Sequence, residues 1–380
     1  MNKRKMRKKI APPDSLKIIF FVPNLMSGGA EKVFVNLANY ISETRDSDVY
    51  LMSSFGGFFD SQVHSTVTSI DLRGKTIFQT INIVKYLQPD IIISTLDAAN
   101  IRNVLFKLCI RSRTLYITRV PSICTSWYKK SGLKNKIHSL LGAMAYRCSD
   151  YVIANSPDSK ESCIRHCWVN ENKIYVIGNP VLSQAEISSI RQDHLHHNKY
   201  VLAVGSFKIQ KRFDLLIDVF EKVLRTNDGL ELWIAGDGGE LKNEIIKLIE
   251  KKGLSDNVKL LGRSSRLKDL YTNSECLILT SEIEGFGNVI VESMACGTVP
   301  VCFNCPGGPH YILDEGQYGI LVPFGDTNKM AESITGLIDG RIVYNKQLLR
   351  ERSRYFTTEN MGNIYFNTMK ELYISKFGKL

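Results

Sequence analysis

The stretch that decides the fold covers residues 281–301 and reads SEIEGFGNVIVESMACGTVPV. Its pattern predicts the end of a strand, a glycine-flanked turn, a short helix over about residues 288–296, a glycine stop and a further strand. Two carboxylates, Glu284 and Glu292, bracket the turn and the helix. Eight residues of helix rise about 12 Å and rotate the side chain by roughly 80°. Both carboxylates can therefore face one cleft at different depths, which suits an elongated polar ligand better than one metal ion.

The middle of this stretch is suited to phosphate. The free N–H groups near Gly287 and Asn288 point at the same cleft, and the start of a helix favours an anion. A stretch that binds phosphate in its middle, and whose terminal carboxylates can accept hydrogen bonds from hydroxyl groups, suggests a nucleotide sugar as the ligand. Glu292 would then accept hydrogen bonds from ribose hydroxyls, and Glu284 would meet the sugar. The alternative is that both glutamates lie on a solvated helix face.

The run EGFGNVIVESMACGTVPV resembles, nearly residue for residue, the E-x7-E signature of the group 1 (family 4) retaining glycosyltransferases. The resemblance implies a GT-B fold, in which two doubly wound Rossmann-like α/β domains face each other across a cleft. It also implies that the residues of the turn bind the donor, and these are Glu284, Gly285, Phe286, Gly287, Asn288 and Glu292.

Length and composition agree with two soluble domains. A chain of 380 residues with 44% hydrophobic and 23% charged residues is ordinary for a globular protein. No apolar run approaches the roughly 18 to 20 residues that span a bilayer. The nine cysteines have no framework spacing, which favours a reduced cytosolic compartment. We expect the Cys163–His166–Cys167 group and the Cys302/Cys305 pair to be ordinary thiols rather than metal ligands.

The net charge of +11 is partly local, because residues 1–9 carry six basic residues and no acid. A basic tail over residues 1–15 can be a solvated segment, an anchor to anionic lipid headgroups or an arm for nucleic acid. No aromatic residues interleave with the charges, so nucleic acid is not expected as a partner. The following residues supply no apolar region for a signal peptide.

Alternating strand and helix patterns divide the chain. We expect an N-terminal acceptor-side domain over residues 16–182, a polar linker over 183–199 and a C-terminal nucleotide-sugar-binding domain over 200–357. The final helix, within residues 358–380, returns to the first domain in the family that the chain resembles. The first strand leads into SGGAE, also typical of this family, which assigns Gly28 and Gly29 to donor binding. No G-x-G-x-x-G dinucleotide motif is present there.

A loop of glycine and basic residues follows the strand expected at 200–205. It reads GSFKIQKRFD and resembles the family segment V-G-R-x4-K-G-F-D, so that Lys211 falls on the lysine that contacts the diphosphate. The family's arginine is Ser206 here, and a serine hydroxyl carries no charge. Lys208 and Arg212 are candidates to replace it. Resemblances in this and two further turns assign donor binding to Gly205, Ser206, Gly236, Gly262 and Arg263.

The acceptor side offers fewer candidates. Asp97 follows a strand of the first domain, where α/β folds place ligand groups, and is a candidate catalytic residue with Glu284 and Lys211. Arg119 aligns with the arginine of a family S-E-R-N segment. Tyr311 stands where the family's C-P-x-G-P-x-E turn has its glutamate. No D-x-D motif ends a strand, so neither a metal nor a cofactor is expected beside the nucleotide sugar, which we expect to be UDP-linked.

The sequence thus predicts a cytoplasmic, peripherally membrane-associated retaining glycosyltransferase. It would move a hexosyl or N-acetylhexosaminyl group from a nucleotide diphosphate sugar to a glycan acceptor, plausibly lipid-linked, in surface polysaccharide or lipopolysaccharide assembly. The expected partners are the donor, the acceptor and an anionic membrane surface. Two alternatives remain open: a GT-B epimerase or phosphorylase, and an inactive binding subunit, which the departures at Ser206 and Tyr311 suggest.

Overall fold

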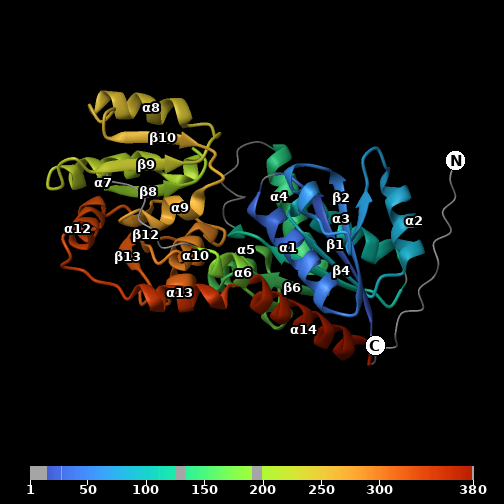
Figure 1. Ribbon diagram of the computed structural model, residues 1–380. Coiled ribbons are helices and arrows are strands. Elements are labelled where there is room, and N and C mark those ends of the chain that lie inside the picture. Colours follow the sequence, from blue (N-terminus) through green and yellow to red (C-terminus); the bar gives the residue numbers. More distant parts are fainter. Residues whose placement is uncertain (1–14, 27, 111, 125–132, 191–198, 379–380) are drawn as a thin grey trace.

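The computed structural model describes residues 15–26, 28–110, 112–124, 133–190 and 199–378. Its two parallel β-sheets lie beside each other, and helices cover both (Figure 1). The basic tail and the histidine-rich part of the expected linker lie outside the described residues, except for Ser15 and Lys199 at their ends. The predicted class, two doubly wound α/β domains, is confirmed.

The first sheet has seven strands in the order β3-β2-β1-β4-β5-β6-β7, all parallel. Sequence reasoning missed β3, because its four residues are mostly exposed and form no apolar run. The strands are β1 (Leu16–Asn24), β2 (Ser47–Phe55), β3 (Thr68–Asp71), β4 (Ile91–Thr95), β5 (Leu115–Val120), β6 (Tyr151–Ala154) and β7 (Ile174–Val176).

The second sheet has six parallel strands in the order β10-β9-β8-β11-β12-β13. Its strands were all expected from their apolar runs. They are β8 (Tyr200–Val204), β9 (Glu231–Ala235), β10 (Val258–Gly262), β11 (Cys276–Leu279), β12 (Val299–Asn304) and β13 (Ile320–Pro323).

Helices pack on both faces of each sheet. The strands are apolar at nearly every position, so both of their faces have to be buried. In β1, Ile18 and Phe20 face the cluster that contains α1, whereas Ile19 and Phe21 face α2 and α3. The helices are α1 (Gly29–Thr44), α2 (Ile77–Leu87), α3 (Asp97–Cys109), α4 (Leu133–Cys148), α5 (Pro157–Cys167), α6 (Gln184–Ser188), α7 (Phe213–Leu224), α8 (Lys242–Lys251), α9 (Leu267–Thr272), α10 (Asn288–Ala295), α11 (Gly308–Leu313), α12 (Thr327–Ile338), α13 (Lys346–Tyr355) and α14 (Thr358–Phe377).

Each sheet has one point where the strand order reverses, between β1 and β4 in the first and between β8 and β11 in the second. Loops that leave neighbouring strands in opposite directions open a crevice there, at the carboxyl ends of the strands. The loops after β1 and β4 begin α1 and α3. Those after β8 and β11 hold Lys211 and Glu284. The strand order therefore brings together segments that are distant in sequence.

An apolar junction connects the two halves. One core cluster contains Val181 and Leu182 as well as Phe286 and Phe356. Backbone bonds join the same segments, from Val181 N to Phe356 O at 2.9 Å and from Thr358 N to Leu182 O at 2.9 Å. From this junction α14 runs along the first domain beside α1 (Figure 1).

The linker expected at residues 183–199 is partly helical. Its first part forms α6, because the Ser183 hydroxyl accepts from Glu186 N at 3.0 Å and the Glu186 carboxylate accepts from Ser183 N at 2.8 Å. This reciprocal capping satisfies two N–H groups that a helix start leaves free. A five-residue helix has too little periodicity to be predicted from sequence.

The close packing of α14 on α1 is testable at Gly362. A Cβ atom there would lie 2.3 Å from Cδ1 of the Tyr40 ring. Gly→Ala inside a helix ordinarily gains about 1 kcal/mol. We expect Gly362→Ala instead to lower the free energy of unfolding by about 1–3 kcal/mol, the usual cost of overpacking. Urea denaturation measures this, and a gain in stability would show that α14 does not pack against α1 at this residue.

Candidate active site

An ion pair lies at the reversal point of the second sheet. Lys211 Nζ is 2.5 Å from Oε1 of Glu284, and the Ser281 hydroxyl donates to the same oxygen at 2.5 Å. Both charged side chains are largely buried, with 16% and 10% of their surfaces exposed. The structure thus brings together two of the predicted catalytic residues, which are 73 positions apart in the chain.

Backbone contacts hold the two loops in register. The Thr280 hydroxyl donates to Lys211 O at 3.0 Å, and Glu282 N donates to Gln210 O at 2.8 Å. The loops leave adjacent strands, β8 and β11, so little chain separates these bonds from the sheet. The positions of Lys211 and Glu284 are therefore fixed by the strands rather than by the side chains alone.

Gly307 and Gly308 pack directly against the backbone of the loop that carries Glu284. A Cβ atom on Gly307, where φ is +129°, would lie 2.0 Å from Glu284 O, and one on Gly308 would lie 1.6 Å from Phe286 O. Glu284 N also donates to Pro306 O at 3.1 Å. Since such distances are far below van der Waals contact, only glycine fits at these two positions.

The start of α10 meets the first domain. Gly287, with φ of +94°, precedes the helix, and no side chain caps its first turn. The Asn288 Oδ1 atom instead accepts a bond of 2.9 Å from Asn179. A Cβ on Gly29, the first residue of α1, would lie 3.6 Å from Asn288 Nδ2, and a Cβ on Gly285 would lie 2.5 Å from Pro121 O. Two helix starts, each favourable to anions, therefore face one space.

Gly28 precedes α1 and packs on that helix rather than on the second domain. A Cβ atom there would lie 2.2 Å from the carboxylate of Glu31. Burial raises the pKa of Glu31, while a backbone hydrogen bond and the charge of Lys208 oppose the rise. Lys208 of the second domain therefore lies close enough to α1 to act on its first turn.

Arg119, the residue predicted for the acceptor side, lies inside the first domain. Its side chain is fully buried. The guanidinium donates to Thr95 Oγ1 at 3.3 Å, to Tyr365 Oη at 3.1 Å and to Oδ1 of Asn179. Because Asn179 in turn bonds Asn288, Arg119 positions the start of α10 from within the first domain.

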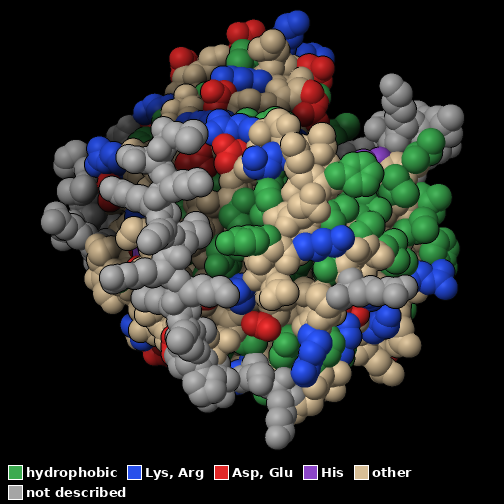
Figure 2. All heavy atoms as spheres, turned by 90° about the vertical axis from the view of Figure 1, so that its right-hand side faces the viewer, with side chains coloured by type: hydrophobic (Ala, Val, Ile, Leu, Met, Phe, Trp, Pro, Cys, Tyr) green, Lys and Arg blue, Asp and Glu red, His purple; other side chains and the backbone are tan. Residues whose placement is uncertain are grey.

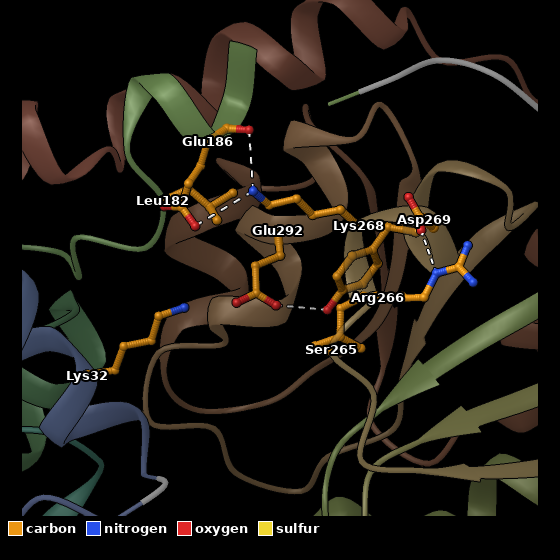
Figure 3. Close-up of a pocket in the computed structure, with 10 residues that line it drawn as sticks. Lys32, Leu182, Glu186, Ser265, Arg266, Lys268, Asp269 and Glu292 are labelled. Carbon is orange, nitrogen blue, oxygen red and sulfur yellow. Dashed lines mark hydrogen bonds and ion pairs between the residues drawn. The ribbon is translucent and has the colours of Figure 1, made fainter. Parts of the chain in front are cut away.

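Glu292 lies in the middle of α10, one turn after Asn288, and lines a cavity of about 470 Å³ between the two halves. Figure 3 shows Lys32 of α1 and Glu292 pointing toward the same open space, with Glu186 beside Lys268. The Tyr271 hydroxyl donates to Glu292 Oε2 at 3.0 Å, and Tyr271 is itself buried. The cavity is lined by Lys32, Leu182, Glu186, Ser265, Arg266, Leu267, Lys268, Asp269, Tyr271 and Glu292.

The turns with the remaining predicted donor-binding residues pack against one another. Gly236 N donates to Gly262 O at 2.7 Å, and a Cβ on Gly236 would lie 1.9 Å from Gly205 O. Ser206 lies in the same loop and is half-buried, whereas Arg263 is exposed. Close backbone approach explains the glycine at 236, where the φ is +149°.

Of the two candidates to replace the missing arginine, Arg212 is already paired. Its guanidinium binds both carboxylate oxygens of Asp214, at 2.7–3.2 Å. That bond raises the pKa of Arg212, so its charge is firmly held on α7. Lys208, exposed and close to Glu31, is the cation that remains free to turn toward a ligand.

Tyr311 belongs to an aromatic group under the turn. Its ring meets Phe286 at 6.4 Å and Phe356 at 5.9 Å, each edge to face. Burial raises the pKa of Tyr311 to about 12, so its hydroxyl stays protonated. The residue therefore supports Phe286 through packing, and it does not supply the negative charge that a glutamate would.

Asp97 is the first residue of α3, at the reversal point of the first sheet. Its carboxylate is 3.7 Å from Nδ1 of His138 on α4. The side chain is partly exposed, which leaves it accessible to an acceptor. The structure thus places Asp97 at the carboxyl edge of its sheet, as the strand pattern predicted.

The cysteine group differs from the one expected. Cys124 joins Cys163 and Cys167, and their sulfur atoms all lie within 4.8 Å, with Cys124 and Cys163 at 3.4 Å. All three are buried in an apolar cluster with Tyr146 and Val152. Apolar surroundings disfavour three thiolate charges, so the interpretation as ordinary thiols stays our prediction.

Sequence reasoning missed several residues of this site. Tyr271 acts through a hydrogen bond to Glu292, and Asn179 acts through hydrogen bonds to Arg119 and Asn288. Such contacts between distant segments cannot be read from sequence spacing. Lys32 and Lys268 enter the cavity from helices of different halves. Ser281 could have been found, because it is the first residue of the stretch quoted above.

Comparison with known proteins identifies both halves. Residues 186–354 match the model "Glycosyl transferases group 1", and residues 27–182 match "Glycosyltransferase Family 4". A solved structure of HepE from Anabaena in complex with UDP-glucose superposes with a TM-score of 0.75 at 20% identity, covering 94% of this chain and all of that one. At this identity the superposition shows the fold alone.

Two relatives come from Campylobacter jejuni. N-acetylgalactosamine-N,N'-diacetylbacillosaminyl-diphospho-undecaprenol 4-alpha-N-acetylgalactosaminyltransferase is 26% identical over 56% of this chain and 57% of its own length. The second, GalNAc-alpha-(1->4)-GalNAc-alpha-(1->3)-diNAcBac-PP-undecaprenol alpha-1,4-N-acetyl-D-galactosaminyltransferase, is 25% identical over 84% of this chain and 88% of its own length. The chain thus spans little more than half of the first relative and most of the second.

The bond from Tyr271 to Glu292 gives a test of the cavity. We expect Tyr271→Phe to weaken UDP binding by roughly 3- to 10-fold, because one hydrogen bond that positions the carboxylate is lost. Isothermal titration calorimetry measures this. Tyr200→Phe is the matched control, since Tyr200 is also buried and its hydroxyl donates to a backbone oxygen, Leu270 O, at 2.7 Å. Equal affinities of Tyr271→Phe and wild type would contradict a role for Glu292 in nucleotide binding.

Proposed function

The chain belongs to the group 1, family 4 glycosyltransferases, and from this premise we propose that it transfers a hexosyl or N-acetylhexosaminyl group from a UDP-sugar to a lipid-linked glycan, with retention of configuration. The product would belong to a surface polysaccharide or lipopolysaccharide. The observation that carries the proposal is the buried Lys211–Glu284 pair beside the uncapped start of α10.

The residues divide between the parts of such a donor. Glu292, at the cavity, suits the ribose hydroxyls. The N–H groups at the start of α10 and the ammonium of Lys211 suit the diphosphate. Glu284 Oε1 holds Lys211, and we assign its Oε2 to a hydroxyl of the transferred sugar. The order from base to sugar then follows α10 from its middle to its start.

The reaction breaks the bond between the anomeric carbon and a diphosphate oxygen and forms a bond from that carbon to an acceptor oxygen. The departing diphosphate oxygen takes the electron pair of the broken bond and gains negative charge, and it accepts the proton that the acceptor hydroxyl loses. Lys211 and the helix start are already oriented toward that charge, so little reorganisation is needed during the reaction. Lys208 is the residue we assign to the place of the family's arginine, and Asp97 lies on the side from which the acceptor would arrive.

A lipid-linked acceptor is proposed from the two relatives above, whose names specify undecaprenol-linked substrates. A UDP donor is proposed from the structural likeness to HepE, which was solved with UDP-glucose. Among the described helices, none combines the length and the apolar character needed to cross a bilayer. We propose a cytoplasmic enzyme that associates with the membrane surface.

The ion pair can be tested by removing each charge. We expect Lys211→Met and Glu284→Gln each to lower kcat/KM by roughly 10²- to 10³-fold, the usual effect of losing one group that stabilises the transition state. Each also leaves a buried charge without its partner, so the melting temperature should fall. Lys247→Ala, on the exposed face of α8, is the control and should retain full activity.

The double variant Lys211→Met/Glu284→Gln separates catalysis from stability. It should recover much of the melting temperature, because no unpaired charge remains, yet stay inactive. Product formation that depends on an acceptor distinguishes transfer from epimerase or phosphorylase activity. Full turnover in the double variant would refute the proposed chemistry, and a wild type that neither hydrolyses nor transfers any UDP-sugar would favour an inactive binding subunit.

A further inference from the structure

Three neighbouring helices of the first domain expose large apolar side chains to solvent. Helices α2, α3 and α4 lie side by side on one face of the first sheet, away from α1 and α14. Phe78 is 75% exposed and Leu108 is 74% exposed. The apolar face consists of Phe78, Tyr86, Leu105, Leu108, Ile137, Leu140, Leu141 and Met144.

These residues follow helical spacing and so form the outward side of each helix. On α4, Ile137, Leu141 and Met144 are exposed at intervals of four and three, while Ala143 and Tyr146 are buried against the domain. A solvent-facing helix side is ordinarily polar. Figure 2 looks at the end of the molecule that carries α2 and shows hydrophobic side chains gathered over one side of it.

Basic residues prevail among the charged residues of these helices. Among the side chains that the structure describes there, the acidic one is Asp97, at the start of α3, and the basic ones are Lys85, Arg102, Lys107 and Arg147. Figure 2 shows Lys and Arg side chains beside the hydrophobic ones. An apolar surface interspersed with basic residues fits a bilayer with anionic headgroups, where apolar burial and electrostatic attraction add.

The face also continues to the acceptor side of the site. Helix α3 carries Asp97 at its first residue and Leu105 and Leu108 near its end. Arg102 Nη1 donates to Ser54 Oγ at 2.5 Å, which ties the middle of α3 to the end of β2. The carboxyl ends of the strands thus lie at the border of the apolar face.

We propose that the outward face of α2, α3 and α4 docks on the surface of a bilayer that contains anionic lipid. This inference deepens the proposed function, because it names the surface through which the enzyme would reach a lipid-linked acceptor. It is also independent of the basic tail, which lies outside the described residues.

Vesicle flotation tests the proposal with the full chain. The probes are vesicles of phosphatidylcholine alone and of phosphatidylcholine mixed with phosphatidylglycerol. We expect binding to the mixed vesicles, and at least about tenfold weaker partitioning for the triple variant Leu108→Ser/Leu140→Ser/Met144→Ser. Val343→Ser is the matched control, because Val343 is 82% exposed on the second domain. It should bind as the wild type does.

Two further variants separate the sources of binding. Lys85→Glu/Arg147→Glu should reduce binding to the mixed vesicles, and a chain without residues 1–9 should retain the sensitivity to the triple variant. Unchanged flotation of the triple variant, or loss of all binding on removal of the tail alone, would overturn the proposal. So would a dimer that the triple variant converts to a monomer in light scattering, since the face would then bind a second copy. UDP affinity, measured without vesicles, should be equal in all variants and reports separately on the donor site.

Discussion

The carboxyl ends of the two sheets meet, and this constraint decides the rest of the structure. Gly29 after β1 approaches Asn288 after β11, and Asp158 at the start of α5 accepts a bond of 2.8 Å from Gly307 N after β12. Loops at strand ends carry the polar groups of an α/β domain. When the ends of two sheets meet, groups from both domains share one crevice, and a ligand placed there is bound from both sides.

The Lys211–Glu284 pair is better explained by function than by stability. Removing two charges from water costs several kcal/mol per ion, and a buried ion pair seldom stabilises more than apolar residues of similar volume would. Here the pair lies in loops that follow neighbouring strands, and Ser281, the Thr280 hydroxyl and the Gln210 carbonyl fix its geometry. A site arranged in advance for the charge of a diphosphate accounts for that cost.

Sequence reasoning predicted the arrangement of residues that lie within one segment, and it missed contacts between segments that are distant in the chain. Glu284, Asn288 and Glu292 lie within one turn and one helix, so their spacing could be derived from helix geometry. The contact of Lys211 with Glu284 follows only from the neighbouring positions of β8 and β11. The burial of Arg119 could not be predicted, because Tyr365, which accepts a hydrogen bond from it, comes 246 positions later. The exposed apolar face was missed because helical periodicity is the same for a buried side and an exposed one.

The arrangement of the two domains bears on how a membrane-bound acceptor could be used. The groups proposed to bind the nucleotide come mainly from the second domain, while the apolar face belongs to the first. If the outward sides of α3 and α4 rest on a bilayer, Asp97, the first residue of α3, belongs to the domain that touches the lipid. Under the proposed function, the lipid-linked acceptor would come from the lipid surface beside the first domain, and the UDP-sugar would come from solution beside the second. The two substrates would then approach the crevice from different sides. A crevice between the carboxyl ends of two sheets is open on both sides, whereas a pocket at the end of a single sheet has one entrance.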